Sequence, residues 1–362
     1  MKIYAFYLPQ FHTIAENDEW WGKGFTEWVN VKKAKPLFSD HDQPKVPLDN
    51  YYYDLSDKET LKWQSDLMKK YKVDGLCFYH YWFTGQQLLQ KPAEILLENK
   101  DIDLPFLFSW ANEPWTRTWD GGDKHVLMPQ NYGTEKNWID HFNYLLPFFK
   151  DSRYQKHNGK PIFLLYRSTS FIDCAEWMKC WRSLASKSGI GDIHFVSMQT
   201  IFEEDKRSIG FDAKVYFEPV NTIRYSINIG VNRLFNKISN KTKAMSNTLL
   251  DTNYIENSED YDEIWSNILA KKIGEYNYSG AFVSWDNTPR KGTKGLYIKN
   301  FSTEKFKKYF DLLYSKSKEN NVPYLFINAW NEWAEGTYLE PDIKNEYKCL
   351  EAIKSVVSKY ND

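Results

Sequence analysis

The chain has 362 residues, a formal net charge of -1 and 42% hydrophobic residues, which is enough to build a sizeable core. This even charge balance excludes the strongly basic composition that is typical of nucleic-acid-binding proteins, so we expect no nucleic-acid partner. No run of about 18 apolar residues is present to span a bilayer, and we expect no membrane insertion.

Aromatic residues are the unusual part of the composition. The 15 Trp, 25 Tyr and 23 Phe make up 17% of the chain. Such rings either fill a core or stack on the apolar faces of sugars, and the composition leaves both uses open. The four cysteines have neither zinc-site spacing nor the density of a secreted disulfide scaffold, so we expect free thiols.

The segment from Met1 to Pro9 resembles a strand rather than a signal peptide, because it has no charged segment followed by a long apolar stretch and a cleavage site. We therefore expect a cytoplasmic protein. A sugar substrate would then be made or handled inside the cell.

Short apolar strands alternate with amphipathic helical patterns along the chain, which is typical of an α/β fold with a parallel sheet. Eight strands are predicted: Ile3 to Leu8, Gly75 to Tyr81, Pro105 to Trp110, Pro161 to Tyr166, His194 to Gln199, Ala213 to Phe217, Ala281 to Trp285 and Tyr324 to Ala329. Helices are predicted at Asp57 to Tyr71, Gln87 to Asn99, Glu135 to Phe149, Ile172 to Lys187, Tyr261 to Tyr276, Thr303 to Asn320 and Asn345 to Lys359. Eight strand-helix units predict a (β/α)8 TIM barrel in a single domain over residues 1–362, with the helix between Thr200 and Gly210 short or missing.

Three connections after strands are much longer than usual: Pro9 to Ser56, Ala111 to Thr134 and Pro219 to Asp260. We expect these long βα loops on the catalytic face of the barrel, where they shape the substrate cleft. The third loop is basic and contains Arg224, Arg233, Lys237, Lys241 and Lys243. It is interpreted either as a lid or anion-binding patch, or as a solvated loop.

In a barrel, the residues at the carboxyl ends of the strands converge on one mouth, so polar and aromatic residues there are candidates for binding an oligosaccharide or glycan. The predicted substrate-binding residues are Tyr7, Gln10, His12, His80, Tyr81, Trp82, Trp110, Asn112, Glu113, Trp115, Trp119, Tyr166, Glu218, Trp285, Asp286, Asn331 and Trp333. The two histidines either donate hydrogen bonds to sugar hydroxyls or are satisfied within the core. We predict no metal and no cofactor, because no metal-ligand spacing or phosphate-binding loop is present.

The stretch from Tyr324 to Pro341 carries the strongest catalytic signal. After the last predicted strand, Glu332 and Glu335 lie three residues apart among the aromatic residues Trp330, Trp333 and Tyr338. Two carboxyls in an aromatic cup suit glycoside chemistry, where one donates a proton and the other stays ionised. We expect Glu335 to be the acid with the raised pKa and Glu332 to be its ionised partner. Alternatively, both acids belong to an ordinary helix N-terminus.

Three motifs carry a resemblance to a known family. They are Y-A-F-Y-L-P-Q-F-H with N-D-E-W-W-G-K-G-F-T-E-W, then W-A-N-E-P-W-T-R-T-W-D-G, and finally N-E-W-A-E-G-T-Y-L-E-P. In this order, over nearly the whole chain, they resemble the WbsX-type proteins of bacterial surface-polysaccharide clusters. Those proteins are similar to the endo-α-mannosidases of glycoside hydrolase family 99.

This resemblance implies roles only at the last motif, where N-E-W-x-E-G is shared. Glu332 would act as a base on the sugar 2-hydroxyl, giving a 1,2-anhydro intermediate and net retention. Glu335 would protonate the leaving oxygen and later activate the incoming one. Ala334 stands where the hydrolases often have His, which changes the surroundings of the acid.

Alternatives remain open for both the site and the activity. Glu113, in Asn112-Glu113-Pro114, either works with Glu332 across the barrel or binds sugar hydroxyls. The chain is expected to be a retaining α-glycosidase or transglycosylase, or else a glycosyltransferase of O-antigen, lipopolysaccharide or capsule biosynthesis. The D-x-D candidate for the latter, Asp101-Ile102-Asp103, precedes the third strand. A third possibility is a sugar-binding protein without catalysis, and oligomeric state is not predicted.

Overall fold

The computed structural model describes residues 1–117, 125–200, 210–227, 230–250 and 252–361. Eight parallel strands close into a barrel, which confirms the predicted (β/α)8 fold. The barrel strands are β1 (Lys2–Tyr7), β2 (Gly75–Phe83), β4 (Phe106–Trp110), β8 (Lys160–Leu165), β9 (His194–Gln199), β10 (Ala213–Tyr216), β12 (Asn277–Phe282) and β14 (Tyr324–Asn328). Strand β1 pairs with both β14 and β2, so the sheet has no free edge there.

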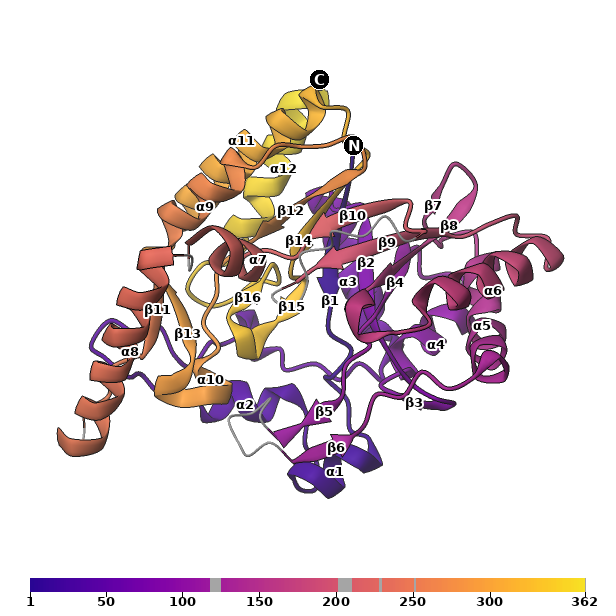
Figure 1. Cartoon of the computed structure of the whole chain (residues 1–362). Helices are drawn as coiled ribbons and strands as arrows, with labels where there is room; N and C mark the ends of the chain where they lie inside the picture. Colours follow the sequence, from indigo (N-terminus) through magenta and orange to yellow (C-terminus); the bar gives the residue numbers. More distant parts are fainter. Residues whose placement is uncertain (118–124, 201–209, 228–229, 251, 362) are drawn as a thin grey trace.

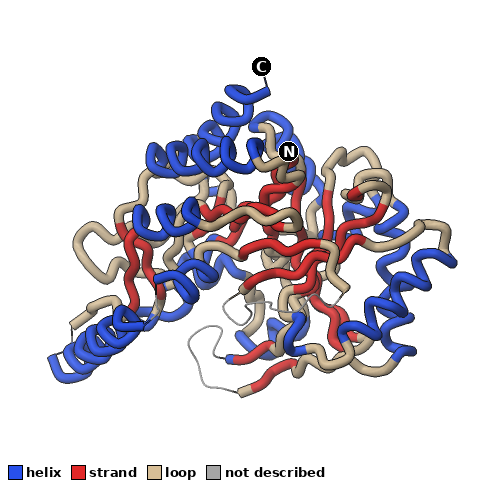
Figure 2. Tube along the Cα trace, turned by 45° about the horizontal axis from the view of Figure 1, so that its top comes forward, coloured by secondary structure: helices blue, strands red, loops and turns tan. Residues whose placement is uncertain are grey.

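Helices surround the barrel strands (Figures 1 and 2). They are α3 (Lys58–Tyr71), α4 (Lys91–Glu98), α5 (Glu135–Lys150), α6 (Cys174–Lys187), α9 (Tyr261–Ala270), α11 (Thr303–Glu319) and α12 (Lys348–Asn361). All seven predicted helices are therefore present with shifted ends; for example, β3 (Gln86–Leu88) occupies the start of the range expected for α4. The short helix expected between Thr200 and Gly210 lies outside the described residues.

The seventh barrel strand is displaced from its predicted position. It was expected over Ala281 to Trp285, but β12 starts at Asn277 because Lys214 and Val215 of β10 pair with Asn277 and Tyr278. Its first four residues, N-Y-S-G, are not an apolar run, so the apolar pattern did not mark them.

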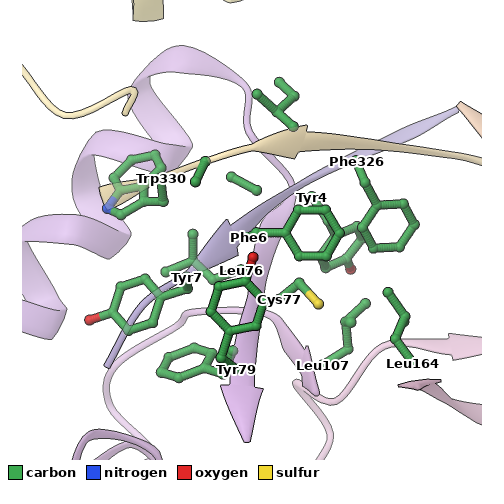
Figure 3. Close-up of a cluster of buried hydrophobic side chains, with 14 of the residues drawn as sticks. Tyr4, Phe6, Tyr7, Leu76, Cys77, Tyr79, Leu107, Leu164, Phe326 and Trp330 are labelled. Atoms are coloured by element: carbon green, nitrogen blue, oxygen red, sulfur yellow. The ribbon is translucent and has the colours of Figure 1, made fainter. Parts of the chain in front are cut away.

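The core lies inside the barrel and between the barrel and its helices. Figure 3 shows Tyr4 and Phe6 of β1 beside Tyr79 of β2 and Phe326 of β14. The Phe6 ring lies 5.9 Å from the Tyr79 ring and 5.6 Å from the Phe326 ring. Because successive residues of a strand point to opposite faces, every second residue faces the barrel interior and the others face the helices.

The long loops gather at the carboxyl ends of the strands, on the side away from both termini (Figure 1). The first loop contains α1 (Ala15–Trp21) and α2 (Glu27–Lys33), and the second contains β5 (Trp115–Thr116) and β6 (Val126–Met128). After β12 come α10 (Thr288–Lys291) and β13 (Leu296–Lys299), which pairs with β11 (Asn257–Asp260).

The third long loop is regular and largely helical in its described part, although much of it is exposed to solvent. It contains α7 (Val220–Thr222), a turn of π-helix (Ile223–Ile227) and the long helix α8 (Gly230–Leu250). Within the described residues, no helix combines enough length with enough apolar character to cross a membrane. The four cysteines are free, as expected.

Gly280 of β12 marks a close approach between neighbouring strands. A Cβ atom on Gly280 would lie 2.0 Å from the carbonyl oxygen of Tyr216 in β10. We expect Gly280→Ala to lower the free energy of unfolding by about 1–3 kcal/mol, because a rigid backbone atom blocks the added methyl group. Gly274→Ala is the control: it is exposed, its nearest contact is a side-chain atom at 3.4 Å, and we expect a change within about 0.5 kcal/mol. Equal losses in urea unfolding would contradict this account.

Candidate active site

A cavity of about 1050 Å³ opens at the carboxyl ends of the barrel strands. Seven of the predicted site residues line it: Tyr81, Glu113, Trp115, Tyr166, Trp285, Glu332 and Glu335. Aromatic rings from four different strand ends thus surround a space of the size that proteins use for organic ligands. Its cationic lining residues are Arg167, Arg224, Lys237, Arg290 and Lys291.

His80, Trp82 and Trp110 do not line the cavity, because strand alternation turns them toward the helix layer. His80 Nε2 lies 2.8 Å from Nε2 of His141 on α5, and the Trp82 ring stacks on the same imidazole at 4.4 Å. The Trp110 ring contacts His141 at 4.7 Å and Trp177 of α6 at 5.6 Å. Burial lowers the pKa of His80 to about 3, so this imidazole is neutral.

Asn112 and Asn331 hold strand ends together instead of facing the cavity. Asn331 Oδ1 accepts from the Leu8 backbone N–H at 2.8 Å, and its Nδ2 donates to the Leu8 carbonyl at 3.0 Å. Asn112 does the same with Arg167: its Oδ1 accepts from the N–H at 2.7 Å and its Nδ2 donates to the carbonyl at 2.8 Å. Each amide side chain therefore extends the hydrogen bonding of the barrel by one rung beyond the last strand residue.

The structure corrects the predicted aromatic cup around Glu332 and Glu335: Trp330 and Trp333 contact a different carboxyl, Glu340, and the Tyr338 hydroxyl donates to Asp342 at 2.6 Å. The indole N–H groups of Trp330 and Trp333 donate to Glu340 at 2.9 Å and 2.7 Å. Burial raises the pKa of Glu340 to about 7 despite these donors.

Tyr7 also lies outside the cavity. Its hydroxyl donates to Gln64 at 2.9 Å, and Gln64 donates in turn to Glu340 at 2.7 Å. Tyr7 and Trp333 are thus both part of the packing beneath the last loop.

Two further predicted residues have polar partners of their own and are not among the residues that line the main cavity. Asp286 accepts from Gln43 at 2.6 Å and lies 2.8 Å from His41 Nε2, and these contacts lower its pKa against the effect of burial. Glu218 accepts from Lys271 at 2.5 Å and from the Thr222 backbone N–H at 3.1 Å.

Gln10 and His12 are buried in the first loop and are not among the cavity-lining residues. Burial lowers the pKa of His12. Trp119 lies outside the described residues, so its predicted role remains a prediction.

The centre of the site is Arg290, the last but one residue of α10. Its guanidinium is buried and reaches three carboxyls: Glu335 at 2.5 Å, Glu332 at 3.3 Å and Glu27 of α2 at 3.0 Å. These groups come from three connections that are far apart in the sequence. Because both loop acids contact one planar group, Arg290 fixes their carboxyls side by side at the cavity wall.

The turn that carries Glu335 is held against the seventh strand end. The Asp286 backbone N–H donates to the Glu335 carbonyl at 2.7 Å, and Gly336 follows with φ of 62°. A Cβ atom on Gly336 would lie 2.9 Å from the Asp286 Cβ, so both the positive φ and the close contact require glycine. The short strands β15 (Asn331–Glu332) and β16 (Thr337–Tyr338) then pair across this turn.

The protonation of the pair differs from the expectation that Glu332 is the ionised partner. Burial raises the pKa of Glu332 to about 8; the Arg290 charge opposes this shift, and the charges of Glu335 and Glu27 add to it. Burial also raises the pKa of Glu27. One guanidinium among three acids leaves an excess of negative charge, so the cluster retains a proton near neutral pH, and we place it on Glu332.

Glu113 stands apart from this cluster on the same cavity wall. Its carboxylate lies 3.4 Å from Arg167, and burial raises its pKa. The charge of Glu335 adds to that rise, which places the two acids within electrostatic reach of each other.

Among the described residues, no group of three or more His, Cys, Asp or Glu side chains is arranged to hold a metal ion. The Glu27, Glu332 and Glu335 carboxyls are instead directed at a guanidinium. That no metal or cofactor is needed stays a prediction.

The sequence analysis missed Arg290 and Glu27. Arg290 lies four residues after Asp286, within W-D-N-T-P-R, beyond the predicted strand-end residues Trp285 and Asp286. Glu27 lies in the first long loop, 263 positions before Arg290. The available signal was only its position: Arg290 stands in the loop that follows the seventh barrel strand, on the catalytic face.

The fold and the site together define a class of protein. Paired acids and aromatic rings in a cavity at the carboxyl ends of a (β/α)8 barrel are typical of carbohydrate-active enzymes. Residues 3–353 match the family model described as Glycosyltransferase WbsX, and the chain belongs to this family.

Two curated relatives are proteins named "Uncharacterized protein WxcX" from two strains of Xanthomonas campestris pv. campestris. Each is 33% identical over 99% of this chain, which spans 50% of the relative's length. The chain thus covers about half of each of these curated relatives.

Similar solved structures share the fold at low sequence identity. A GH99 endo-alpha-mannosidase from Bacteroides thetaiotaomicron matches with a TM-score of 0.56 and 15% identity, covering 99% of this chain and 96% of that one. The structure of such an enzyme with BIS-TRIS-propane gives 0.54 and 16%, again over 99% and 96%. A "Glycoside hydrolase-like protein" gives 0.58 and 12%, over 98% and 93%.

The raised pKa of Glu332 predicts a pH-dependent stability. The folded chain binds this proton more tightly than the unfolded chain, so the stabilisation is full below about pH 4.5 and is lost as pH rises toward about 8. Urea unfolding at pH 5 and pH 8.5 should show the wild type losing on the order of a few kcal/mol more than Glu332→Gln. Glu351→Gln, an exposed acid on α12, is the control and should behave as the wild type. Parallel losses in wild type and Glu332→Gln would refute the assignment.

Arg290 should contribute more to the free energy of unfolding than an exposed surface cation does. Arg290→Met leaves three acids without their shared counter-charge, and we expect a loss of roughly 3–5 kcal/mol in the free energy of unfolding at pH 8. Because acid neutralises the carboxyls, the loss should shrink at pH 5. Lys136→Met removes an exposed partner of Asp140 and should cost less than about 1 kcal/mol. A comparable effect of the two substitutions would contradict the central role of Arg290.

Proposed function

We propose that this chain acts on α-glycosidic bonds of an oligosaccharide with retention of configuration, by cleavage or by transfer to another sugar, in bacterial surface-polysaccharide metabolism. The observation that carries the proposal is the binding of Glu332 and Glu335 to one guanidinium at the wall of a large aromatic cavity. The proposal also draws on the N-E-W-x-E-G resemblance and on the names of the endo-alpha-mannosidases that share the fold.

In the proposed reaction, Glu332 removes the proton of the sugar 2-hydroxyl, and that oxygen attacks the anomeric carbon. The bond to the leaving oxygen breaks as Glu335 donates a proton to it, which gives a 1,2-anhydro sugar. Glu335 then takes a proton from the incoming hydroxyl, whose oxygen attacks the anomeric carbon and opens the three-membered 1,2-anhydro ring. Glu332 returns to the 2-oxygen the proton that it had removed. Two displacements at one carbon restore the configuration.

At rest the cluster holds its proton on Glu332, so the proposed reaction starts from the form of the pair in which that proton lies on Glu335 and Glu332 is ionised. In that form Glu332 is a stronger base than an ordinary carboxylate, and a catalytic pKa close to the working pH is favourable for proton transfer. Arg290 contacts both acids, so it holds them in position while their charges change. The rings of Tyr81, Trp115 and Trp285 offer faces for sugar stacking.

A glycosyltransferase is the second candidate, and two observations favour it. The family model carries that description, and Arg224, Lys237 and Lys291 line the cavity where a diphosphate leaving group would meet positive charge. Against it, the D-x-D candidate precedes β4, and its Asp103 is an exposed partner of Lys69. The chain is proposed to work in the cytoplasm in either case.

One experiment separates the candidates. The protein is incubated with α-linked manno-oligosaccharides and surface glycans, and separately with UDP- or GDP-sugars plus an acceptor. We expect new reducing ends or transglycosylation products with retained anomeric configuration by NMR, and no nucleotide release. Nucleotide release without glycan cleavage would establish the glycosyltransferase instead, and consumption of neither substrate despite glycan binding would favour a sugar-binding protein.

Substitutions then test the residues. Glu332→Gln and Glu335→Gln should each lower turnover about a hundredfold or more, while the exposed control Glu351→Gln should leave it unchanged. We propose that Glu113 binds substrate, so Glu113→Gln should raise KM more than it lowers kcat. A loss of kcat with Glu113→Gln as complete as with Glu332→Gln would make Glu113 catalytic.

A further inference from the structure

Helix α8 carries its apolar residues on the outside. Leu234, Ile238, Met245 and Leu249 are 59%, 56%, 53% and 74% exposed. At about 100° per residue, these four side chains form a stripe roughly 60° wide, and Phe235, 67% exposed, lies at its edge. Helices that cover the barrel show the opposite pattern, as α11 does by burying Phe306, Phe310, Leu313 and Tyr314.

The opposite face of α8 is polar and attaches the helix to the protein. The side-chain amide of Asn247 donates to the Tyr254 carbonyl at 2.8 Å and accepts from the Tyr254 N–H at 2.8 Å. The amide groups of Asn240 and Asn257 lie 2.7 Å apart. Asn240 also lines the active-site cavity, so the helix has one face at the cavity and one face in water.

The charge of α8 selects the partner. The exposed Lys237 and Lys241 lie along one side of the apolar stripe, on the side away from Phe235, and residues 234–250 contain no Asp or Glu. An apolar stripe bordered by lysines is the arrangement of helices that lie in a membrane interface, where lysine stems extend toward anionic head groups. A second copy of the chain fits less well, because pairing two α8 helices face to face would bring like charges together.

We propose that α8 attaches the protein to the surface of an anionic lipid bilayer. Its Leu and Ile side chains enter the interface, its lysines meet phosphate groups, and the helix lies in the plane of the membrane without crossing it. Figures 1 and 2 show α8 at the edge of the molecule, where a flat surface can reach it. Since Asn236 and Lys237 line the cavity, attachment brings the cavity rim close to the membrane. That the substrate is then a glycan carried on a lipid rests on the proposed function; the attachment itself does not.

The test is co-sedimentation of the full chain with vesicles of phosphatidylcholine alone and of phosphatidylcholine with phosphatidylglycerol. We expect binding to the anionic vesicles that weakens with added salt. The double variant Ile238→Ser with Leu249→Ser should bind roughly tenfold or more weakly, because two side chains lose their burial in the interface. Lys241→Gln should bind about fivefold more weakly at low salt.

Matched controls lie on α11, where Leu312 is 48% exposed and Lys307 is exposed. Leu312→Ser and Lys307→Gln should bind as the wild type does, and all variants should keep the wild-type melting temperature because each changes an exposed side chain. Equal binding to both kinds of vesicle, no binding, or undiminished binding of the α8 variants would overturn the proposal. So would light scattering that shows a wild-type dimer and a monomeric double variant, since a second copy would then cover the stripe. Vesicle binding is measured without substrate, so its outcome is independent of the enzymatic test.

Discussion

The site depends on one buried cation. Arg290 binds Glu27 of the first loop, and Glu332 and Glu335 of the last loop. A single guanidinium therefore connects, at the catalytic face, the loops that follow the first and the last barrel strands. Burying the Arg290 guanidinium costs a large desolvation free energy. The three carboxyls offset this cost because their oxygens accept hydrogen bonds from the planar N–H groups of the arginine. The same excess of acid over base keeps a proton on the cluster, which couples the stability of this face to its proton chemistry.

The aromatic residues around this cluster form two groups with different roles. Rings of Tyr81, Trp115, Tyr166 and Trp285 line the cavity, whereas Trp82, Trp110, Trp330 and Trp333 pack behind it. The second set satisfies buried polar groups: indole N–H groups reach Glu340, and indole rings enclose His141. The cavity wall is therefore supported by a packed layer in which the indole N–H groups of Trp110, Trp330 and Trp333 are hydrogen-bonded, and this packing helps to keep the facing carboxyls in place.

The third long loop adds a second surface to the same face. Its α8 packs through asparagine amides and leaves an apolar stripe in solvent, an arrangement that costs stability in water and is explained by a partner. One side of α8 borders the cavity. The lipid surface proposed for its other side would therefore affect how the substrate reaches the cavity, and would not contact the reacting atoms.

The sequence by itself determined the number, order and parallel arrangement of the strands, because eight apolar runs separated by helical patterns allow few other folds. It also placed Glu332, Glu335 and Glu113 at the right end of the barrel. Only the tertiary structure decided which strand residues face inward. Barrel strands such as β2 are buried on both faces and read as continuous apolar runs, so the sequence pattern does not tell which alternate residues point into the barrel. For this reason His80 and Tyr81 looked equivalent. The pairing of Arg290 with Glu27 across 263 positions, the proton on Glu332 and the outward stripe of α8 likewise arise from contacts between distant segments, which no local pattern encodes.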